Sequence, residues 1–383
     1  MKVALVADIH LDVACRWDEA LRVNRWVSED ARARGVEVVA IGGDVFERRP
    51  LPLETRAAAE WFIELATFAE VVGVYGNHDV ENSLAVMNRL ESVHPITIYD
   101  RPAVHVTRSG LAVGCIPWPR KANLLASLDR PVSSEESSGM VRDCLRAIFL
   151  GLRNELAAHD GPRMGLAHAM ISGAKTDHDQ PLIGVDLEIS MEELALLDVP
   201  FIGVGHVHAQ NAWSWNGVEL AYPAALIHRN FGEPGPKGYI VVEFDGPRLV
   251  GWERVPTPCT PMVLLEAVWR DGAFTGTRER IADAENGAEV RFRWRVDAEH
   301  RDAAKRAALQ FRDELMAVGA VSVKLDEEVI ATVRARAPEI AAAKTLSEKL
   351  DALRASRGEV ITEERRNRLE AKLSQLEQEV TGD

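Results

Sequence analysis

The chain has 383 residues and a formal net charge of −14, with 46% hydrophobic and 27% charged residues. The length predicts two or three domains with a sizeable core, and the acidic balance argues against a broad basic surface for nucleic acid. No apolar run approaches the roughly 18 residues of a membrane span, and the N-terminus lacks the pattern of a signal peptide. The cysteines are too scattered for a thiolate metal site, so we expect reduced thiols in a cytoplasmic protein: Cys15, Cys115, Cys144 and Cys259.

The first part of the chain alternates strands and helices. Apolar runs predict strands over residues 3–7, 36–41 and 71–75. The periodic segments between them predict helices that end near Gly35 and Phe68. This order implies a parallel sheet with right-handed crossovers.

Further elements are expected up to about residue 250. A polar, serine-rich segment over residues 131–139 predicts an exposed loop, and residues 140–158 predict a helix. The predicted strands of this part cover residues 96–99, 104–106, 111–116, 163–167, 201–204 and 240–244.

Prolines at positions 256, 258 and 261 mark a predicted domain boundary. The pattern after it predicts a small α+β domain, with a helix over residues 303–318 and strands over 262–269, 288–296 and 320–325. We therefore predict three parts, which cover residues 1–253, 254–338 and 339–383.

The last of these parts predicts two short helices with leucine stripes. Thr345 and Glu348 fit a capping box, and Gly358 separates the two helices. A spacing of three or four residues places these leucines on one face of each helix: Leu346, Leu350, Leu353, Leu369, Leu373 and Leu376. Because charged residues surround the stripes, they either pack back on the body or dock another protein.

Five predicted strand ends carry residue types that bind metal ions. The residues are Asp8, His10, Asp44, Asn77, His78, His168, His206 and His208. Oxygen donors mixed with imidazoles suit Mn²⁺, Fe²⁺ or Zn²⁺. Their number exceeds what one catalytic ion needs and suits two ions that share a bridging carboxylate. A single short motif such as Asp-X-His arises easily by chance. The prediction therefore rests on the presence of metal-binding residue types at all five strand ends.

These residues occur as the blocks DIH, GGD, GNHD, a lone His and GHVH, in that order. The order resembles the signature of the calcineurin-like metallophosphoesterase superfamily, which implies an αββα sandwich and two-metal phosphoester hydrolysis. The resemblance implies one metal on Asp8, His10 and His208, and a second on Asn77, His168 and His206, with Asp44 bridging both. It also implies that His78 stabilises the transition state or protonates the leaving oxygen, and that Asp79 orients His78.

Three further features are similar to the SbcD-type DNA-repair nucleases of this superfamily. They are the segment GDVFERRP at residues 43–50, the α+β part after residue 260 and the helical tail. The resemblance implies a Mn²⁺-dependent nuclease of double-strand-break repair, with 3′→5′ exonuclease action on duplex DNA ends and endonuclease action on single strands or hairpins. It further implies an SbcC-type coiled-coil ATPase as partner, bound through the C-terminal helices, with two copies of each subunit.

One block departs from the SbcD-type pattern, and one property opposes it. Where that pattern has Tyr-Pro-Gly-Ser, this chain has Tyr222-Pro223-Ala224-Ala225, which changes backbone freedom and removes a hydroxyl. The net charge of −14 favours a stand-alone phosphatase or a cyclic-nucleotide phosphodiesterase, unless bound cations or a partner supply the positive field. The intact ligand set opposes a third alternative, a non-enzymatic scaffold.

Candidate cations for DNA phosphates are present near the predicted strand ends. Each is as well explained as an ordinary solvated charge: Arg48, Arg49, Arg120, Lys121 and Lys175.

Overall fold

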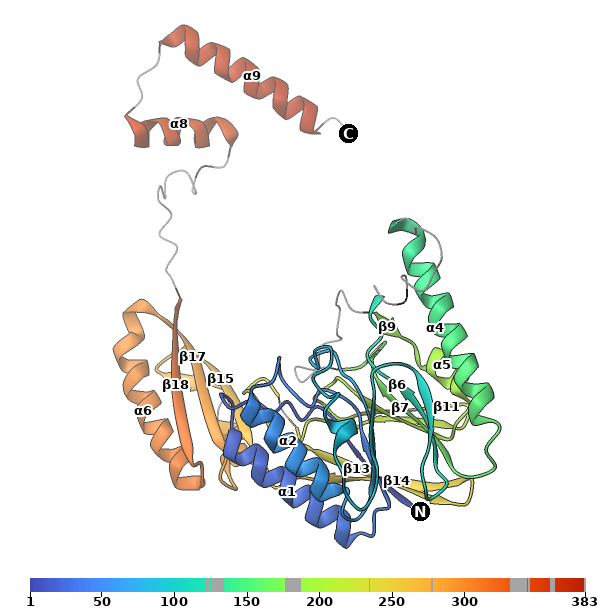
Figure 1. The fold of residues 1–383 in the computed structure, drawn as a ribbon. Helices are drawn as coiled ribbons and strands as arrows, with labels where there is room; N and C mark the ends of the chain where they lie inside the picture. Colours follow the sequence, from blue (N-terminus) through green and yellow to red (C-terminus); the bar gives the residue numbers. More distant parts are fainter. Residues whose placement is uncertain are drawn as a thin grey trace. The chain divides into compact units, whose positions relative to one another are not determined.

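The computed structural model describes residues 1–121, 124, 134–175, 187–233, 235–276, 278–330, 343, 345–358 and 362–381 (Figure 1). The chain divides into two compact units. The first comprises Met1–Glu266, Thr277–Phe292 and Phe311–Leu325, and the second comprises Ala267–Gly276, Arg293–Gln310 and Asp326–Asp383. The boundaries expected after residues 253 and 338 stay predictions.

The first sheet has six strands in the order β14-β13-β1-β2-β3-β4. The strands β1 to β4 run parallel, whereas β13 runs antiparallel to β1 and β14 runs antiparallel to β13. The predicted parallel order of the first three strands is therefore confirmed. The bounds are β1 Lys2–Val6, β2 Val38–Ile41, β3 Glu70–Val74, β4 Ile96–Tyr99, β13 Gly238–Asp245 and β14 Arg248–Pro256.

The second sheet has six strands in the order β11-β12-β10-β7-β6-β5. Its four central strands run parallel, and the edge strands β5 and β11 run antiparallel to their neighbours. The bounds are β5 Ala103–Val106, β6 Ala112–Ile116, β7 Arg163–His168, β10 Phe201–Gly205, β11 Asn211–Trp215 and β12 Val218–Tyr222. A short parallel pair, β8 Met170–Ile171 and β9 Glu188–Ile189, follows β7 in the chain.

Three apolar cores hold these sheets in an α/β sandwich. Helices α1 (Trp17–Ala33) and α2 (Pro52–Leu65) lie side by side and cover the outer face of the first sheet (Figure 1). Helices α4 (Ser134–Leu156) and α5 (Met191–Leu194) contribute to the core on the outer face of the second sheet. The two sheets share the middle core, which explains why their strands are near-continuous apolar runs.

Two parts of this unit differ from the sequence expectation. Helix α4 begins at Ser134, inside the segment predicted as a loop, whose residues 131–133 lie outside the described part. Serine and acidic residues are favoured in the first turn of a helix, so polarity alone does not separate a loop from a helix start. The strands β11, β12 and β14 and the short elements β8, β9 and α5 were not predicted. The residues of β11 and β14 are mostly exposed or half-buried and form no apolar run, and Glu219 interrupts the short apolar run of β12.

The chain after residue 261 forms a sheet in the order β16-β15-β17-β18, accompanied by helix α6. Phe292 of β17 and Phe311 of α6 place their ring centroids 4.9 Å apart, and both are buried. The bounds are β15 Met262–Arg270, β16 Ala273–Thr275, β17 Glu289–Asp297, α6 Arg301–Val318 and β18 Ser322–Ile330. Short 3₁₀ turns occupy η1 Met87–Arg89, η2 Ala195–Leu197, η3 Arg278–Ala284 and η4 Ala298–His300.

The tail contains the two expected helices, α8 (Leu346–Arg357) and α9 (Glu363–Thr381). The capping box is present, since the hydroxyl of Thr345 accepts the Glu348 N–H at 3.1 Å, and Gly358 ends α8 with φ 66°. In the leucine stripes, Leu350, Leu353, Leu369 and Leu373 are half-buried, and the side chains of Leu346 and Leu376 lie outside those described. No helix in the described part of the chain has the length and apolarity to cross a membrane.

Candidate metal centre

The candidate ligands come together at the carboxyl ends of the central strands. Asp8, Asp44 and Asn77 follow the ends of β1, β2 and β3, while His168 ends β7 and His206 follows β10. Ligand atoms of Asp8, His10 and His208 lie within 4.8 Å of one another, as do those of Asp44, His168 and His206. The structure therefore gathers residues from distant parts of the sequence, such as Asp8 and His208, into two adjoining groups.

The backbone at this centre is unusual. Asp8, His10, Asp44 and His206 have φ values of 53°, 48°, 51° and 113°, in the left-handed region that residues other than glycine rarely adopt. Such conformations cost about 1–3 kcal/mol each and concentrate at functional sites. The packing of the loops maintains them, since the carbonyl of Asp44 accepts the N–H groups of both Ile9 and His10 at 3.0 Å.

Two glycines of the motifs are required by close approach. A Cβ on Gly76 would lie 2.0 Å from Asp44 Oδ1, and a Cβ on Gly43 would lie 2.5 Å from His168 Nδ1. Both distances are far below van der Waals contact. The glycines of GGD and GNHD therefore allow the β2 and β3 loops to meet.

Asp44 occupies the position between the two ligand groups. Its Oδ2 lies 3.3 Å from Nε2 of His168 and 3.7 Å from Nε2 of His10. On the first side, Nε2 of His10 and Nε2 of His208 are 2.9 Å apart. On the second side, Oδ1 of Asn77 lies 2.9 Å from His168 Nε2 and 2.8 Å from His206 Nδ1.

Two ring nitrogens that point away from the centre lie close to oxygen atoms. Nδ1 of His168 faces the Gly42 carbonyl at 2.7 Å, which can only accept, so Nδ1 is the protonated nitrogen. Nδ1 of His10 lies 2.9 Å from a carboxylate oxygen of Glu47, a close ion-pair contact without hydrogen-bond geometry, and the neighbouring His10 lowers the pKa of Glu47 to about 2. With Nδ1 protonated, each Nε2 presents its lone pair to the centre, as a metal ligand must. The residues therefore fit a bound metal ion.

Burial and mutual charge perturb the titration of these groups. Burial raises the pKa of Asp8. Burial also opposes the ionisation of Asp44, but the nearby imidazoles, His168 first, hold its pKa well below the usual range. In turn, burial favours a neutral His168, yet the Asp44 carboxylate raises the pKa of His168 to about 9. Without a metal ion these groups favour a positive charge beside Asp44; a bound metal ion would supply that charge and leave Nε2 of His168 unprotonated.

His78 lies beside the two groups. Its backbone N–H donates to Asp44 Oδ1 at 2.8 Å. The His78 ring contacts the His10 ring edge-on, with the ring centroids 4.9 Å apart. The carbonyl of Glu47 accepts from its Nδ1 at 2.7 Å. This contact fixes the imidazole and directs Nε2 away from Glu47.

The expected orienting contact between Asp79 and His78 is replaced by another arrangement. The buried Asp79 carboxylate accepts the N–H groups of Val45, Phe46 and Gly76 at 3.1, 3.2 and 2.9 Å. Burial, and then the charge of Asp44, raise the pKa of Asp79 to about 7. Because three backbone donors use its oxygens, Asp79 fastens the β2 loop to the β3 loop, and the Glu47 carbonyl orients His78.

Sequence patterns missed several residues of the site. Glu47, beside His10, stood in the quoted GDVFERRP segment but had no metal-ligand spacing. Arg229 hydrogen-bonds the His10 carbonyl and lies 3.2 Å from Glu47. The ring of Trp118 stacks at 34° on His206 with centroids 4.7 Å apart. In the sequence, the position of Trp118 two residues after the end of β6 was the feature that could have indicated it.

The candidate DNA-contacting cations have different surroundings. Arg48 pairs with Asp12 at 2.6 Å and lies 3.7 Å from Glu54, so part of its charge is balanced locally. Arg120 donates to the Asp79 carbonyl at 3.3 Å. The remaining candidates are exposed: Arg49, Lys121 and Lys175. Their contact with DNA stays a prediction.

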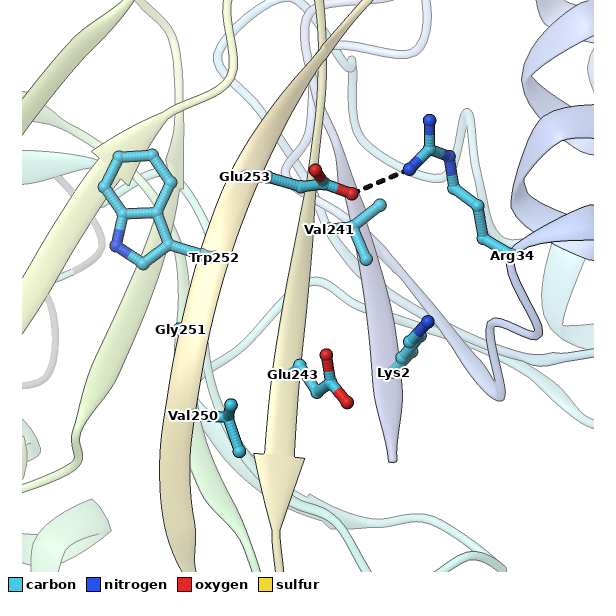
Figure 2. A pocket seen from close by; sticks show the side chains of 8 residues that line it. All are labelled: Lys2, Arg34, Val241, Glu243, Val250, Gly251, Trp252 and Glu253. Atoms are coloured by element: carbon cyan, nitrogen blue, oxygen red, sulfur yellow. Dashed lines mark hydrogen bonds and ion pairs between the residues drawn. The ribbon is translucent and has the colours of Figure 1, made fainter.

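A separate groove of about 310 Å³ lies at the opposite end of β1 (Figure 2). Lys2, the first residue of β1, lines it together with Glu243 and Val250. Across it, Arg34 and Glu253 form an ion pair of 2.7 Å, which Figure 2 shows. Bases and acids are balanced on its walls, so its charge favours no class of ligand.

Comparison with known proteins places the metal-ligand blocks in a family. Residues 1–210 match the calcineurin-like phosphoesterase family, a span that contains all five blocks. No curated protein matches the chain.

Similar solved structures include the protein TT1561 of Thermus thermophilus, at 14% identity and a TM-score of 0.39, covering 62% of this chain and 92% of that one. A dimetal phosphatase from Danio rerio is 13% identical with a TM-score of 0.43, covering 67% and 97%. GAP50, the anchor in the inner membrane complex of Plasmodium, is 11% identical with a TM-score of 0.42, covering 67% and 89%.

Proposed function

Since the chain belongs to the calcineurin-like phosphoesterase family, it is a metal-dependent hydrolase of phosphate esters, and we propose that its substrate is DNA. The observation that carries the hydrolytic function is the pair of ligand groups on either side of Asp44. The mixed carboxylate, amide and imidazole donors suit Mn²⁺, Fe²⁺ or Zn²⁺, and the likeness to the SbcD-type nucleases makes Mn²⁺ the proposed ion.

The proposed ligand sets follow the two groups. Asp8, His10 and His208 would hold one ion, and Asn77, His168 and His206 the other, with Asp44 shared. When bound, two such ions activate water and neutralise the phosphoryl oxygens.

The remaining chemistry belongs to the protein's own side chains. His78 is fixed at Nδ1 by the Glu47 carbonyl, so in the cationic imidazole the proton on Nε2 would stabilise the leaving oxygen or be transferred to it. The backbone N–H of His78 donates to Asp44, so the position of His78 depends on that of the shared ligand.

DNA as the substrate is supported by likeness to the SbcD-type nucleases. The support comes from the GDVFERRP segment, from the α+β part around β15–β18 and from the tail helices with their leucine stripes. On this basis the enzyme degrades duplex ends 3′→5′ and cuts single strands or hairpins during double-strand-break repair. A coiled-coil ATPase of the SbcC type would bind α8 and α9, in an assembly with two copies of each subunit.

The test is incubation of the full chain with Mn²⁺ and end-labelled duplex DNA, with and without EDTA, beside a small chromogenic phosphodiester. The proposal expects cleavage of both substrates in Mn²⁺ and of neither in EDTA. Hydrolysis of the small diester without cleavage of any DNA substrate would reject the nuclease function and keep the family's chemistry.

The second candidate is a stand-alone phosphatase or cyclic-nucleotide phosphodiesterase. The net charge of −14 favours it, because such a charge repels a polyanion more than a small substrate. It predicts fast hydrolysis of small esters without a partner, together with little binding of DNA.

A further inference from the structure

A buried ion pair after β12 contacts His208 at two atoms. Glu233 and Lys237, called here the Glu233–Lys237 pair, are each 2% exposed and lie 3.2 Å apart. Glu233 Oε1 lies 3.2 Å from Nδ1 of His208. The ammonium of Lys237 donates to the His208 carbonyl at 2.9 Å.

The carboxylate itself is held in place from the same segment. It accepts the Arg229 N–H on Oε2 and the Asn230 side-chain N–H on Oε1, both at 3.0 Å. Buried charges are costly alone and offset one another in a pair, so Lys237 allows Glu233 to remain ionised behind His208.

We infer that Glu233 is a positioning residue that sets the tautomer and the direction of His208, and that Lys237 balances its charge and fixes the His208 backbone. An ionised carboxylate accepts from Nδ1, which leaves the lone pair on Nε2, the nitrogen that faces His10 at 2.9 Å. This inference rests on the metal centre proposed above and is independent of DNA as the substrate.

The test compares Mn²⁺ binding by two double variants of the full chain. E233Q/K237M removes both charges but keeps an oxygen that can accept from His208, whereas E233A/K237M removes the acceptor as well. Replacing Lys237 in both avoids an unbalanced buried ammonium, which would itself impair folding. E70A serves as a matched control. Glu70 is also a buried carboxylate, and it lies 2.9 Å from Nε2 of a histidine, His105, that belongs to neither ligand group.

Calorimetric titration of the metal-free proteins with Mn²⁺ gives the readout. We expect two ions on the wild type and on E70A. In E233A/K237M one of the two should bind about 10- to 100-fold more weakly, the usual effect of losing such a support, and E233Q/K237M should recover most of that loss. Wild-type affinity in E233A/K237M, or equal losses in both double variants, would overturn the inference. Failure of the wild type to bind two ions would instead reject the metal centre itself.

Discussion

Ala224 has a backbone conformation that glycine usually adopts. Its φ is 80° and its side chain is fully buried, at the position where the SbcD-type pattern has glycine. The left-handed conformation destabilises the folded state by roughly 1–2 kcal/mol when the residue is not glycine. Alanine in place of glycine stabilises a protein by about 0.4–1 kcal/mol, because it reduces the conformational entropy of the unfolded chain. The departure noted in the sequence is therefore a strained residue.

Ala224→Gly should consequently destabilise the protein less than the same substitution at the next position. Relief of the strain gains about 1–2 kcal/mol, while loss of the buried methyl costs about 0.8 kcal/mol and the more flexible unfolded chain costs about 0.4–1 kcal/mol, so the unfolding midpoint of the metal-free protein should stay nearly unchanged. Ala225→Gly is the control, since Ala225 is also buried and its φ is not positive, and it should lower the midpoint. Equal decreases in the two variants would show that Ala224 is not strained.

The role of His78 predicts a separation of turnover from metal content. His78→Ala should reduce kcat about 10²- to 10⁴-fold, as expected for loss of an acid, while both ions stay bound. The reason is that the His78 ring is anchored by the Glu47 carbonyl outside the proposed ligand sets.

Metal analysis beside kinetics checks this prediction. His208→Ala is the comparison, and it should lose metal as well as activity. If His78→Ala also lost an ion, His78 would have to be counted as a ligand, which its distance to His10 and Asp44 would permit.

At the scale of elements, the described contacts of the tail helices are local. The described links include the Thr345–Glu348 capping box and an ion pair of 3.7 Å between Asp351 of α8 and Arg366 of α9. Half-buried leucines on both helices leave apolar area that a partner helix could cover.

Removal of residues 340–383 should abolish association with the proposed ATPase and leave Mn²⁺-dependent hydrolysis of a small diester unchanged. Leu353→Asp should weaken the association at least 10-fold by placing a charge in the stripe, whereas Ala355→Asp, at an exposed position of α8, should have little effect. Co-purification of both subunits measures the outcome. Retention of the partner by the truncated chain would refute the assignment of the tail.

At the scale of the whole molecule, the net charge of −14 must be reconciled with a polyanionic substrate. Bound divalent ions reduce the negative potential where the five loops meet, so DNA affinity should depend on metal. With the slowly cleaving His78→Ala variant, labelled duplex should bind at least 10-fold more tightly in Mn²⁺ than in EDTA, measured by fluorescence anisotropy at constant ionic strength before cleavage proceeds. Equal affinity in the two conditions would mean that other cations attract the DNA.

Local sequence patterns were sufficient to predict the first three strands, the helices between them and the residue types at the strand ends. They failed for β14 and for the start of α4, where the deciding contacts come from other segments. Asp79 shows the same limit, because its position next to His78 suggested an interaction that its three backbone donors replace.

The sequence by itself determined the family and the ligand types, because apolar strands followed by Asp, Asn and His are encoded within a few neighbouring residues. Only the tertiary structure decided the left-handed φ of Asp8, His10 and Asp44, the anchoring of His78 and the support of His208 by Glu233. The physical reason is that these features depend on packing and hydrogen bonds between separate loops. Such contacts have no spacing that a linear pattern can reveal.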